Sequence, residues 1–330
     1  MSTILFHARE AGVATMFSAL AEPLQRQGYE LIYDVDGHAA NIITNKPKSS
    51  SCEADIIICG YDIAVKDATG KYLNKIKNTI PTLGLLDSWK GVDRFWYANG
   101  KMRPLTDRLI VPDDSIRNYL IQKGVPDKWP VVCGHPYIET LTNVTLPNRE
   151  SLKNVVRNKF KLEDDKRVML LMSEPLNMGN GQSTSLLNRK MMDGRGVMEW
   201  LDDLYGKEYR LAVRKHPLEE AIIPEKWLDI SAGSLADALS LADHVCGLGS
   251  TTLAYAVAYG LDVSCLDQEV EDWVPEQSNI PTSLWNDLII NGIFQNQPNR
   301  ISEKPSFPSF SSTELILIEI MTMLEGSKIN

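Results

Sequence analysis

A segment rich in glycine and hydroxyl residues directly precedes a predicted helix. The stretch DHVCGLGSTTLAYAVAYG (243–260) runs from a short apolar strand through glycines to three consecutive hydroxyl residues and an alanine-rich helix. Free N–H groups at a helix start favour an anion, glycine allows close approach to the backbone, and hydroxyls add neutral donors. Hydroxyl residues also cap helices that bind no ligand. The segment predicts a phosphate site formed by Gly249, Ser250, Thr251 and Thr252.

Two other predicted strands of the same half end in polar residues. AVRKHP ends in Lys215 and His216, and MSEPLNMGNGQSTS (172–185) begins with Glu174 near the strand end and continues as a predicted flexible loop. Ligands of open α/β sheets bind beyond the carboxyl ends of the strands. We therefore expect Lys215 and His216 to contact the same anion and Glu174 to reach a ribose hydroxyl. A structural histidine and a plain surface loop are the alternatives.

The first half of the chain supplies acidic residues at its predicted strand ends. The loop FHAREAG (6–12), the stretch DVDGH (34–38) and the stretch LLDSWKGVDRFW (85–96) each carry one or more of them. A group-transfer reaction needs a base that takes the proton of the attacking hydroxyl, and aromatic rings suit the faces of a sugar. The candidates are Glu10, Asp36 and Asp87 as catalytic residues, with Arg9 and Trp89 as binding residues and His7 beside them in the first loop.

Short apolar strands alternate with helical patterns along the chain, which predicts parallel βαβ units. Strands are expected at 3–7, 30–37, 54–60, 80–87, 107–112 and 129–134, and again at 166–174, 208–217, 244–249 and 262–267. Helices are expected at 12–29, 113–124, 196–206, 235–242, 251–260 and 313–326, the last starting at a Ser/Thr cap with Glu314 in its first turn.

This order predicts an α/β fold with two Rossmann-like, doubly wound domains that face a cleft, and a C-terminal helix. The expected boundaries are 1–140 for the acceptor and catalytic domain, 141–310 for the donor domain and 311–330 for the helix. The Asn-, Thr- and Pro-rich segment 140–150 is the expected linker, and 293–312 is an expected extended connection.

Composition limits the classes of function. The 330 residues are 43% hydrophobic and carry a formal net charge of −9, which argues against a broad nucleic-acid footprint. Five cysteines without a CxxC pair predict reduced thiols, and no apolar run is long enough for a membrane span. We expect a cytoplasmic protein, with peripheral association at the inner membrane left open. The only literal DxD lies at 34–36, in the half that should not bind the donor, so no metal and no cofactor are expected.

The second half resembles the nucleotide-binding half of GT-B glycosyltransferases. The resemblance rests on HP at 216–217, GSTT at 249–252 and the following A…A…G helix, and covers roughly 166–267. It is especially similar to enzymes that use CMP-linked acidic sugars (sialyltransferases and capsule-type Kdo transferases) and to CDP-glycerol-type polymer transferases. In those families the histidine and the Ser/Thr pair contact the donor phosphate, which implies His216, Ser250 and Thr251 here. DVDGH is similar to the acidic signature of bacterial sialyltransferases, with Val35 interposed.

The resemblance implies a metal-independent glycosyltransferase of surface polysaccharide synthesis, such as capsule or lipopolysaccharide. Its partners would be a nucleotide-sugar donor, cytidine-linked by preference and uridine-linked next, and a glycan or lipid-linked glycan acceptor. One alternative is an epimerase of the UDP-GlcNAc 2-epimerase type, or a nucleotide-sugar hydrolase, on the same fold. Another is a non-catalytic protein that binds a nucleotide or sugar. His135, where the halves meet, is expected at a hinge, and His38 and His244 are expected to be structural.

Overall fold

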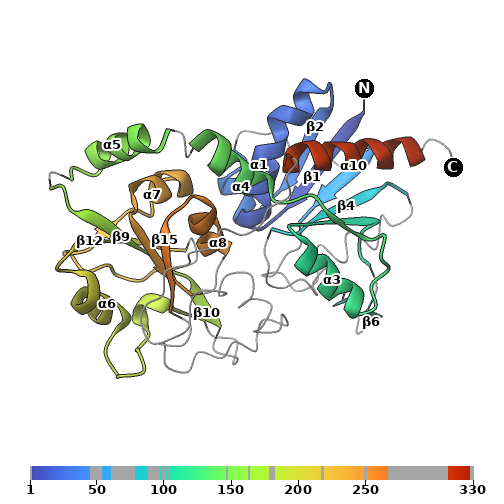
Figure 1. The fold of residues 1–330 in the computed structure, drawn as a ribbon. Helices are drawn as coiled ribbons and strands as arrows, with labels where there is room; N and C mark the ends of the chain where they lie inside the picture. The colour runs from blue at the N-terminus through green and yellow to red at the C-terminus, as the bar shows by residue number, and fades with distance from the viewer. Residues whose placement is uncertain are drawn as a thin grey trace. The chain divides into compact units, whose positions relative to one another are not determined.

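The computed structural model describes residues 2–44, 54–60, 79–87, 97–98, 101–102, 104–145, 148–162, 164–177, 183–216, 219–248, 251–266 and 311–327. The described residues up to Thr140, together with the C-terminal helix, form one compact unit. The described residues from Leu141 to Leu266 form a second unit. Both units have the α/β architecture that the sequence predicts (Figure 1).

The N-terminal unit is built on a parallel sheet of six described strands. Their order is β2 (Glu30–Val35), β1 (Thr3–Ala8), β3 (Ile56–Cys59), β4 (Thr82–Leu85), β7 (Arg108–Val111) and β8 (Pro130–Val132). The order runs outward in both directions from β1 and β3, so the topological switch point lies between these two strands. In such sheets a ligand binds at the carboxyl ends of the strands that flank the switch point. A small hairpin of β5 (Tyr97–Ala98) and β6 (Lys101–Met102) lies outside the sheet.

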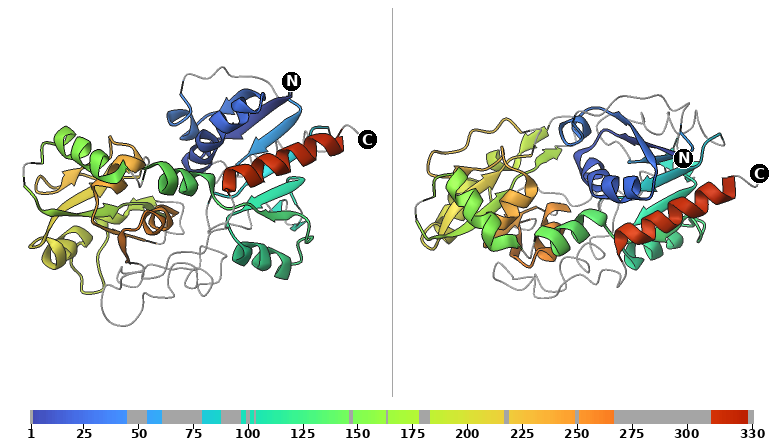
Figure 2. Two further views of the ribbon diagram at one scale, coloured as in Figure 1. Left: turned by 45° about the horizontal axis from the view of Figure 1, so that its top comes forward. Right: turned by 90° about the horizontal axis from the view of Figure 1, so that it is seen from above.

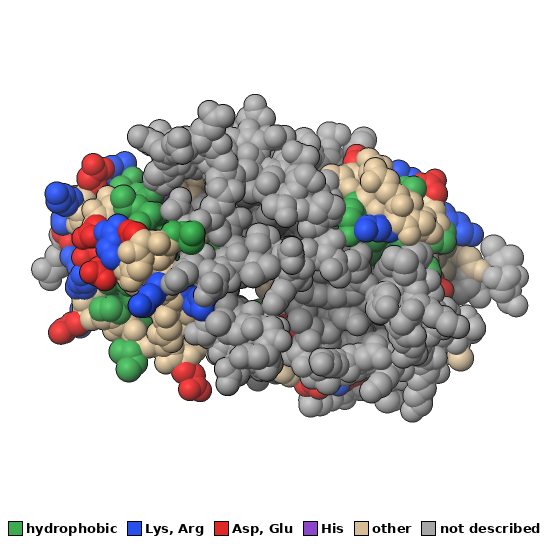
Figure 3. All heavy atoms as spheres, turned by 90° about the horizontal axis from the view of Figure 1, so that it is seen from below, with side chains coloured by type: hydrophobic (Ala, Val, Ile, Leu, Met, Phe, Trp, Pro, Cys, Tyr) green, Lys and Arg blue, Asp and Glu red, His purple; other side chains and the backbone are tan. Residues whose placement is uncertain are grey.

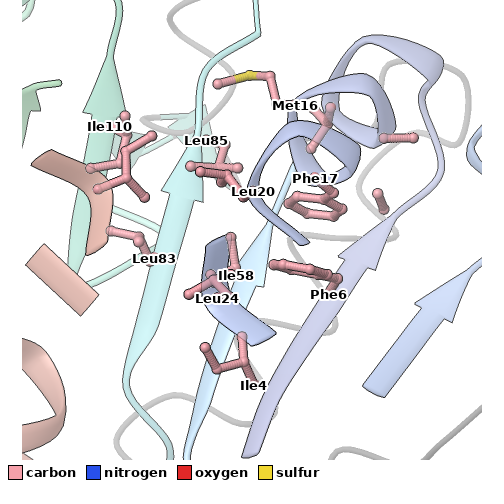
Figure 4. Close-up of a cluster of buried hydrophobic side chains, with 14 of the residues drawn as sticks. Ile4, Phe6, Met16, Phe17, Leu20, Leu24, Ile58, Leu83, Leu85 and Ile110 are labelled. Atoms are coloured by element: carbon pink, nitrogen blue, oxygen red, sulfur yellow. The ribbon is translucent and has the colours of Figure 1, made fainter. Parts of the chain in front are cut away.

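Helix α1 (Ala11–Arg26) covers one face of this sheet because its apolar residues recur at helical spacing. Val13, Met16, Phe17, Leu20 and Leu24 are all buried, as the pattern predicts. Figure 4 shows Phe17 stacked on Phe6 of β1, and the ring centroids lie 4.4 Å apart. Full burial of one such side chain contributes about 1.5–3 kcal/mol. The interaction fixes the start of α1 over the carboxyl end of β1.

The C-terminal helix α10 (Ser312–Ser327) packs in the N-terminal unit, although it follows the whole second unit in the chain. Ile316, Ile320 and Leu324 join the same buried cluster as α1. Arg108 Nε lies 3.1 Å from Glu319 Oε1, and the Thr313 N–H donates to Glu139 Oε2 over 2.9 Å. The Ser311 hydroxyl accepts the Glu314 N–H, which confirms the predicted cap. Figure 2 shows the helix along the α1 side of the sheet, while α3 (Asp114–Gln122) covers the other side.

The C-terminal unit contains a parallel sheet of five described strands. Their order is β13 (Leu228–Asp229), β12 (Tyr209–Arg214), β9 (Arg167–Met172), β14 (His244–Gly247) and β15 (Asp262–Cys265). Helix α6 (Val197–Tyr205) covers one face, and α7 (Leu235–Leu241) and α8 (Thr251–Ala258) cover the other. The switch point of this sheet lies between β9 and β14.

Two segments differ from the sequence expectation. The predicted linker at 140–150 is mostly helical: α4 (Pro136–Thr140) continues into a π-type turn (Leu141–Thr145), and α5 (Arg149–Lys159) follows. Proline is favoured at the first helical position, and full burial of Leu141 outweighs the weak helix propensity of Asn and Thr. The predicted flexible loop at 172–185 contains an antiparallel pair, β10 (Pro175–Asn177) and β11 (Ser183–Ser185). Short 3₁₀ turns at Ala39–Asn41 and Leu186–Asn188 complete the described elements.

Candidate functional site

Three strands of the C-terminal unit end at the same level of the sheet. Arg214 of β12 and Gly247 of β14 both pair with Met172 of β9. The residues that follow, Lys215–His216 and Ser173–Glu174, therefore lie at one carboxyl edge. Helix α8 begins at Thr251, four residues beyond the end of β14. The structure thus brings five predicted site residues to the switch-point edge of this unit: Glu174, Lys215, His216, Thr251 and Thr252.

Strand β9 lies between the histidine and the helix start. Chain order makes β12 the strand that precedes β14, but in the sheet each of them pairs with β9 instead. Neighbouring strands are about 4.8 Å apart, so β12 and β14 are separated by about 10 Å. A ligand held by both His216 and α8 would therefore cross the end of β9, above Ser173 and Glu174. A span of this size suits a nucleoside diphosphate better than a single small anion.

The start of α8 packs closely over β9. A Cβ atom at Gly247 would lie 3.0 Å from the Met172 carbonyl oxygen and 3.3 Å from Leu253 Cδ2, so glycine at this position makes the close approach easier. Thr251 and Thr252 are partly buried, and the helix from Leu253 to Ala258 is buried. The predicted residues Gly249 and Ser250 lie outside the described residues. Only the first turn of α8 therefore lies at the edge.

Lys215 and Arg214 hold the segment that leads to β13. Lys215 Nζ lies 3.4 Å from Asp229 Oδ2, and Arg214 donates to the Gly233 carbonyl over 2.5 Å. Burial raises the pKa of Asp229, but hydrogen bonds from Ser231 and the charge of Lys215 outweigh it, so the pKa lies below its ordinary value. Lys215 thus has a carboxylate partner within its own unit, whereas the sequence predicted only a ligand contact.

A buried glutamate that the sequence analysis missed lies at the same edge. Glu219 Oε1 accepts the hydroxyls of Ser173 at 2.7 Å and Ser185 at 2.5 Å, and Oε2 accepts the His216 N–H at 2.8 Å. The Glu219 side chain is 9% exposed. Its partners lie 46 and 34 residues away along the chain, so no local pattern distinguishes Glu219 from the exposed Glu220. Its position three residues after His216 is the one local signal.

The carboxyl edge of the N-terminal unit holds paired carboxylates. His7 lies inside strand β1, as the expected strand at 3–7 has it, and is 3% exposed. Its Nδ1 lies 2.9 Å from Asp34 Oδ2. Arg9 Nε lies 3.2 Å from Asp36 Oδ1, so the structure brings these two predicted site residues together. Glu10 occupies the N-cap position of α1, where its side chain makes no capping hydrogen bond.

Asp87 follows β4 and packs against the first turn of α1. A Cβ atom at Gly12 would lie 1.8 Å from Asp87 Oδ2, which shows how closely the carboxylate approaches the helix backbone. Gly60, which follows β3, leaves room for Val13 of α1, because a Cβ atom at Gly60 would lie 2.3 Å from Val13 Cγ2. The positive end of the α1 dipole stabilises a negative charge at this place. The predicted neighbour Trp89 lies outside the described residues.

His135 is buried beside Asp87 in the N-terminal unit. It is 1% exposed, and burial lowers its pKa to about 4, although a hydrogen bond to the backbone of Asp87 opposes the shift. The ring is therefore neutral at pH 7 and anchors the segment that carries Asp87. His135 therefore has a structural role in positioning Asp87, and its predicted role at a hinge stays a prediction. His244, expected to be structural, bonds Ser264 and contacts Tyr205 inside the second unit.

Charges of both signs alternate on the face of the C-terminal unit shown in Figure 3. Ion pairs of this unit include Arg195 with Asp203 at 2.5 Å and Lys226 with Asp202 at 2.5 Å. Over the described part of this face, no patch of a single sign would steer a polyanion to the surface.

Among the described residues, no group of three or more His, Cys, Asp or Glu side chains is placed to hold a metal ion. None of the described helices is both long and apolar enough to cross a bilayer.

Solved structures with the same fold are GT-B-type enzymes. The wall teichoic acid polymerase TagF, H444N variant, is 12% identical, with 100% of this chain and 90% of that chain covered at a TM-score of 0.60. UDP-GlcNAc 2-epimerase from Neisseria meningitidis bound to UDP-GlcNAc is 13% identical, with 97% and 100% covered at 0.62. The Methanocaldococcus jannaschii UDP-GlcNAc 2-epimerase is 14% identical, with 98% and 99% covered at 0.57.

No family model and no curated protein matches the sequence. The structural similarities confirm the predicted fold class: two Rossmann-like units of GT-B type with a C-terminal helix.

Proposed function

We propose that the protein is a glycosyltransferase that moves a sugar, or a polyol phosphate, from a nucleotide-linked donor to a glycan or lipid-linked glycan acceptor. A cytidine nucleotide is the favoured carrier, uridine is the next, and surface polysaccharide such as capsule or lipopolysaccharide is the favoured product. One observation carries the proposal. In a fold shared with GT-B-type enzymes, β12, β9 and the start of α8 deliver His216, Ser173–Glu174 and Thr251–Thr252 to one switch-point edge.

The donor's phosphate is the group that this edge suits. The first N–H groups of α8 and the hydroxyls of Thr251 and Thr252 offer donors to phosphate oxygens. His216 offers an imidazole from the other side of β9, and Gly249 and Ser250 complete the proposed set. These groups stabilise the charge that develops on the leaving phosphate. Glu174 is proposed to bond the ribose, and Lys215, held by Asp229, adds positive charge nearby.

Asp87 is the preferred base among the three acidic candidates. It follows a central strand, and its position is fixed by Gly12 and by the bond between its backbone and His135. Asp36 instead forms an ion pair with Arg9, and Glu10 lies at the N-cap of α1. In a single displacement of a sugar, the acceptor oxygen bonds the anomeric carbon while the bond from that carbon to the phosphate oxygen breaks. For a polyol phosphate, the acceptor oxygen bonds the phosphorus that carries the polyol while the bond from that phosphorus to the nucleotide's phosphate oxygen breaks. Asp87 takes the hydroxyl proton, and the nucleotide leaves with the electron pair.

Nucleotide binding is the first test. CMP, CDP, UDP and GDP are added separately, and the melting temperature is measured. A ligand at 100 times its Kd stabilises the fold by about 2.7 kcal/mol, so the preferred nucleotide should give a shift of several degrees. If none of the four raises the melting temperature, the proposed function fails.

His216→Ala tests the position of the donor site. The shift produced by the preferred nucleotide should disappear, because His216 supplies one side of the phosphate site. His38→Ala is the matched control, since His38 belongs to the N-terminal unit and is not among the proposed donor-site residues, and its shift should stay normal. A normal shift in His216→Ala would show that the phosphate binds elsewhere.

Epimerisation is the second candidate function, favoured by the coverage of two UDP-GlcNAc 2-epimerases over 97–98% of this chain. Incubation with UDP-GlcNAc alone separates the two activities. An epimerase or hydrolase forms the 2-epimer or free UDP without an acceptor, whereas a transferase releases nucleotide only when an acceptor is added. Nucleotide binding without turnover in either assay would indicate the non-catalytic alternative.

A further inference from the structure

We propose that Glu219 is a positioning residue that fixes His216 for donor binding. The proposal rests on the proposed function, because the donor phosphate is the ligand that His216 is expected to hold. It assigns a role to a residue that is not expected to touch the donor. The geometry that carries it is a buried carboxylate joining three separate segments at one sheet edge.

Glu219 connects the ends of three elements. Through Oε1 it binds Ser173, which follows β9, and Ser185, which ends β11. Through Oε2 it accepts the backbone N–H of His216, which follows β12. The carboxylate therefore ties the hairpin of β10 and β11 and the two central strand ends into one arrangement. Each element alone would leave its last residues free to change direction.

The link between Glu219 and His216 is double. The Glu219 N–H donates to the His216 carbonyl oxygen over 2.9 Å, while the Glu219 carboxylate accepts the His216 N–H over 2.8 Å. Both hydrogen-bonding groups of the His216 backbone are thus bound by one residue. This fixes the peptide planes on either side of the His216 Cα and so sets the direction of its Cα–Cβ bond, from which the imidazole extends.

Hydrogen bonds stabilise this carboxylate. All three groups that bind it are donors, and the two side-chain oxygens of Glu219 accept from them. Among the residues that the structure describes, no Lys or Arg forms an ion pair with Glu219. The nearby Lys215 pairs with Asp229 instead. A buried carboxylate of this kind is costly to keep unless every donor is in place. The network therefore favours one geometry over alternatives in which His216 turns away.

The first experiment is a double-mutant cycle on nucleotide affinity. Glu219→Gln keeps the side-chain volume but cannot accept from the serines and from His216 at once without rearrangement. We expect it to weaken the Kd of CDP, or of UDP if the unmodified protein prefers it, about tenfold, because a hydrogen bond to a charged group is being lost. In a His216→Ala background, titrated at nucleotide concentrations high enough to saturate the weakened site, the same change should alter the Kd less than about twofold, because coupled residues are not additive.

The controls separate positioning from general damage. Glu220→Gln changes the exposed neighbour and should leave the Kd unchanged. Ser173→Ala with Ser185→Ala removes the two hydroxyl donors but leaves Glu219 and His216 intact, and it should also weaken binding. Equal weakening by Glu219→Gln in both backgrounds, or an unchanged Kd in the first, would overturn the proposal.

A second measurement reads the position of His216 without any nucleotide. The chain has five histidines, so their imidazole resonances can be assigned by substitution. Glu219→Gln should shift or broaden the His216 resonance and speed the exchange of its amide hydrogen, and leave the resonances of His7, His38, His135 and His244 in place. An unmoved His216 resonance would refute the positioning role. If His216 moves but no nucleotide binds the unmodified protein, positioning is supported and the proposed function fails.

Discussion

The two units carry opposite chemistry at equivalent places of one architecture. At the carboxyl edge of the N-terminal sheet, Asp34, Asp36 and Asp87 present carboxylates, each held by an imidazole, a guanidinium or a helix start. At the matching edge of the C-terminal sheet, hydroxyl, imidazole and ammonium groups lie beside one carboxylate, that of Glu174. The buried carboxylate there, Glu219, is bound by hydrogen-bond donors.

In the proposed function, the two edges carry different parts of one reaction. Both sheets direct their strand ends and a helix start to one edge, so the backbone offers the same dipoles twice. The side chains determine which ligand charge each edge favours. Carboxylates suit the removal of a proton from an acceptor, and donors suit an anionic leaving group. Changes at the two edges should therefore have different kinetic signatures.

Asp87→Asn should separate catalysis from binding most clearly. We expect kcat to fall about 10²- to 10⁴-fold, because a positioned base is lost, while the nucleotide Kd changes less than about twofold. Steady-state kinetics and titration of the nucleotide measure the two quantities. Asp36→Asn, at the same edge but paired with Arg9, is the control and should reduce kcat less. Full activity in Asp87→Asn would move the base to another residue, with Glu10 the next candidate.

Core substitutions test whether the units are separately stabilised. Phe17→Ala removes the ring stacked on Phe6 and should destabilise the N-terminal unit by about 3–5 kcal/mol. Leu201→Ala, on the buried face of α6, should destabilise the C-terminal unit by about 2–5 kcal/mol. Hydrogen exchange of peptides from each unit during denaturation is the measurement. Equal loss of protection in both units after either change would contradict separate cores.

Acid should weaken the N-terminal unit first. The folded pKa of His135 is lowered to about 4, so the unfolded chain binds this proton at a higher pH. The unit is therefore fully stable above about pH 6.5 and loses about 3 kcal/mol as the pH falls to about 4. In the C-terminal unit, the lowered pKa values of Asp229 and Asp164 predict losses only below about pH 4.

His135→Gln is the control for this pH dependence. Without the imidazole, the unfolding free energy of the N-terminal unit should change much less between pH 6.5 and 4. Denaturant midpoints at several pH values, with hydrogen exchange to distinguish the units, measure it. A slope that persists in His135→Gln would assign the titration to another group.

Gly12→Ala should have the smallest effect on stability and still reduce turnover. The added methyl group overlaps Asp87 Oδ2, so Asp87 must move, and this overpacking should lower the free energy of unfolding by about 1–3 kcal/mol. The displaced carboxylate should lower kcat by about tenfold or more, since small misplacements of catalytic groups are costly. Gly326→Ala in α10, where a Cβ meets nothing within 4 Å, is the matched control. Unchanged kcat in Gly12→Ala would show that the contact with α1 does not matter for Asp87.

Most strands and helices were predictable because burial on both faces makes strands continuous apolar runs, as in Ile56–Cys59, and helices such as α1 repeat their apolar residues. Helix α5 was missed because only Val156 is buried in it. Charges hold it instead, with Lys153 Nζ 2.6 Å from Asp243 Oδ1. Its acidic first turn and basic last turn were available signals.

The candidate sites were predictable only as far as strand ends reveal them. Strand ends pointed to His216 and Asp87, and the hydroxyl-rich helix start to Thr251, but their roles stay predictions. Glu219 could not be found because its hydroxyl partners are brought to it by sheet order, which chain order does not give. The position of β9 between β12 and β14 could not be predicted for the same reason, because chain order does not give sheet order.

The packing of α10 has a consequence for biosynthesis. Ile316, Ile320 and Leu324 belong to the core of the first unit, yet a ribosome adds them after every described residue of the second. The apolar surface that α10 covers in the folded first unit therefore stays exposed until α10 has been synthesised. During that interval the nascent chain is prone to aggregate, and a chaperone that shields the α1 side of the sheet should raise the yield of folded protein.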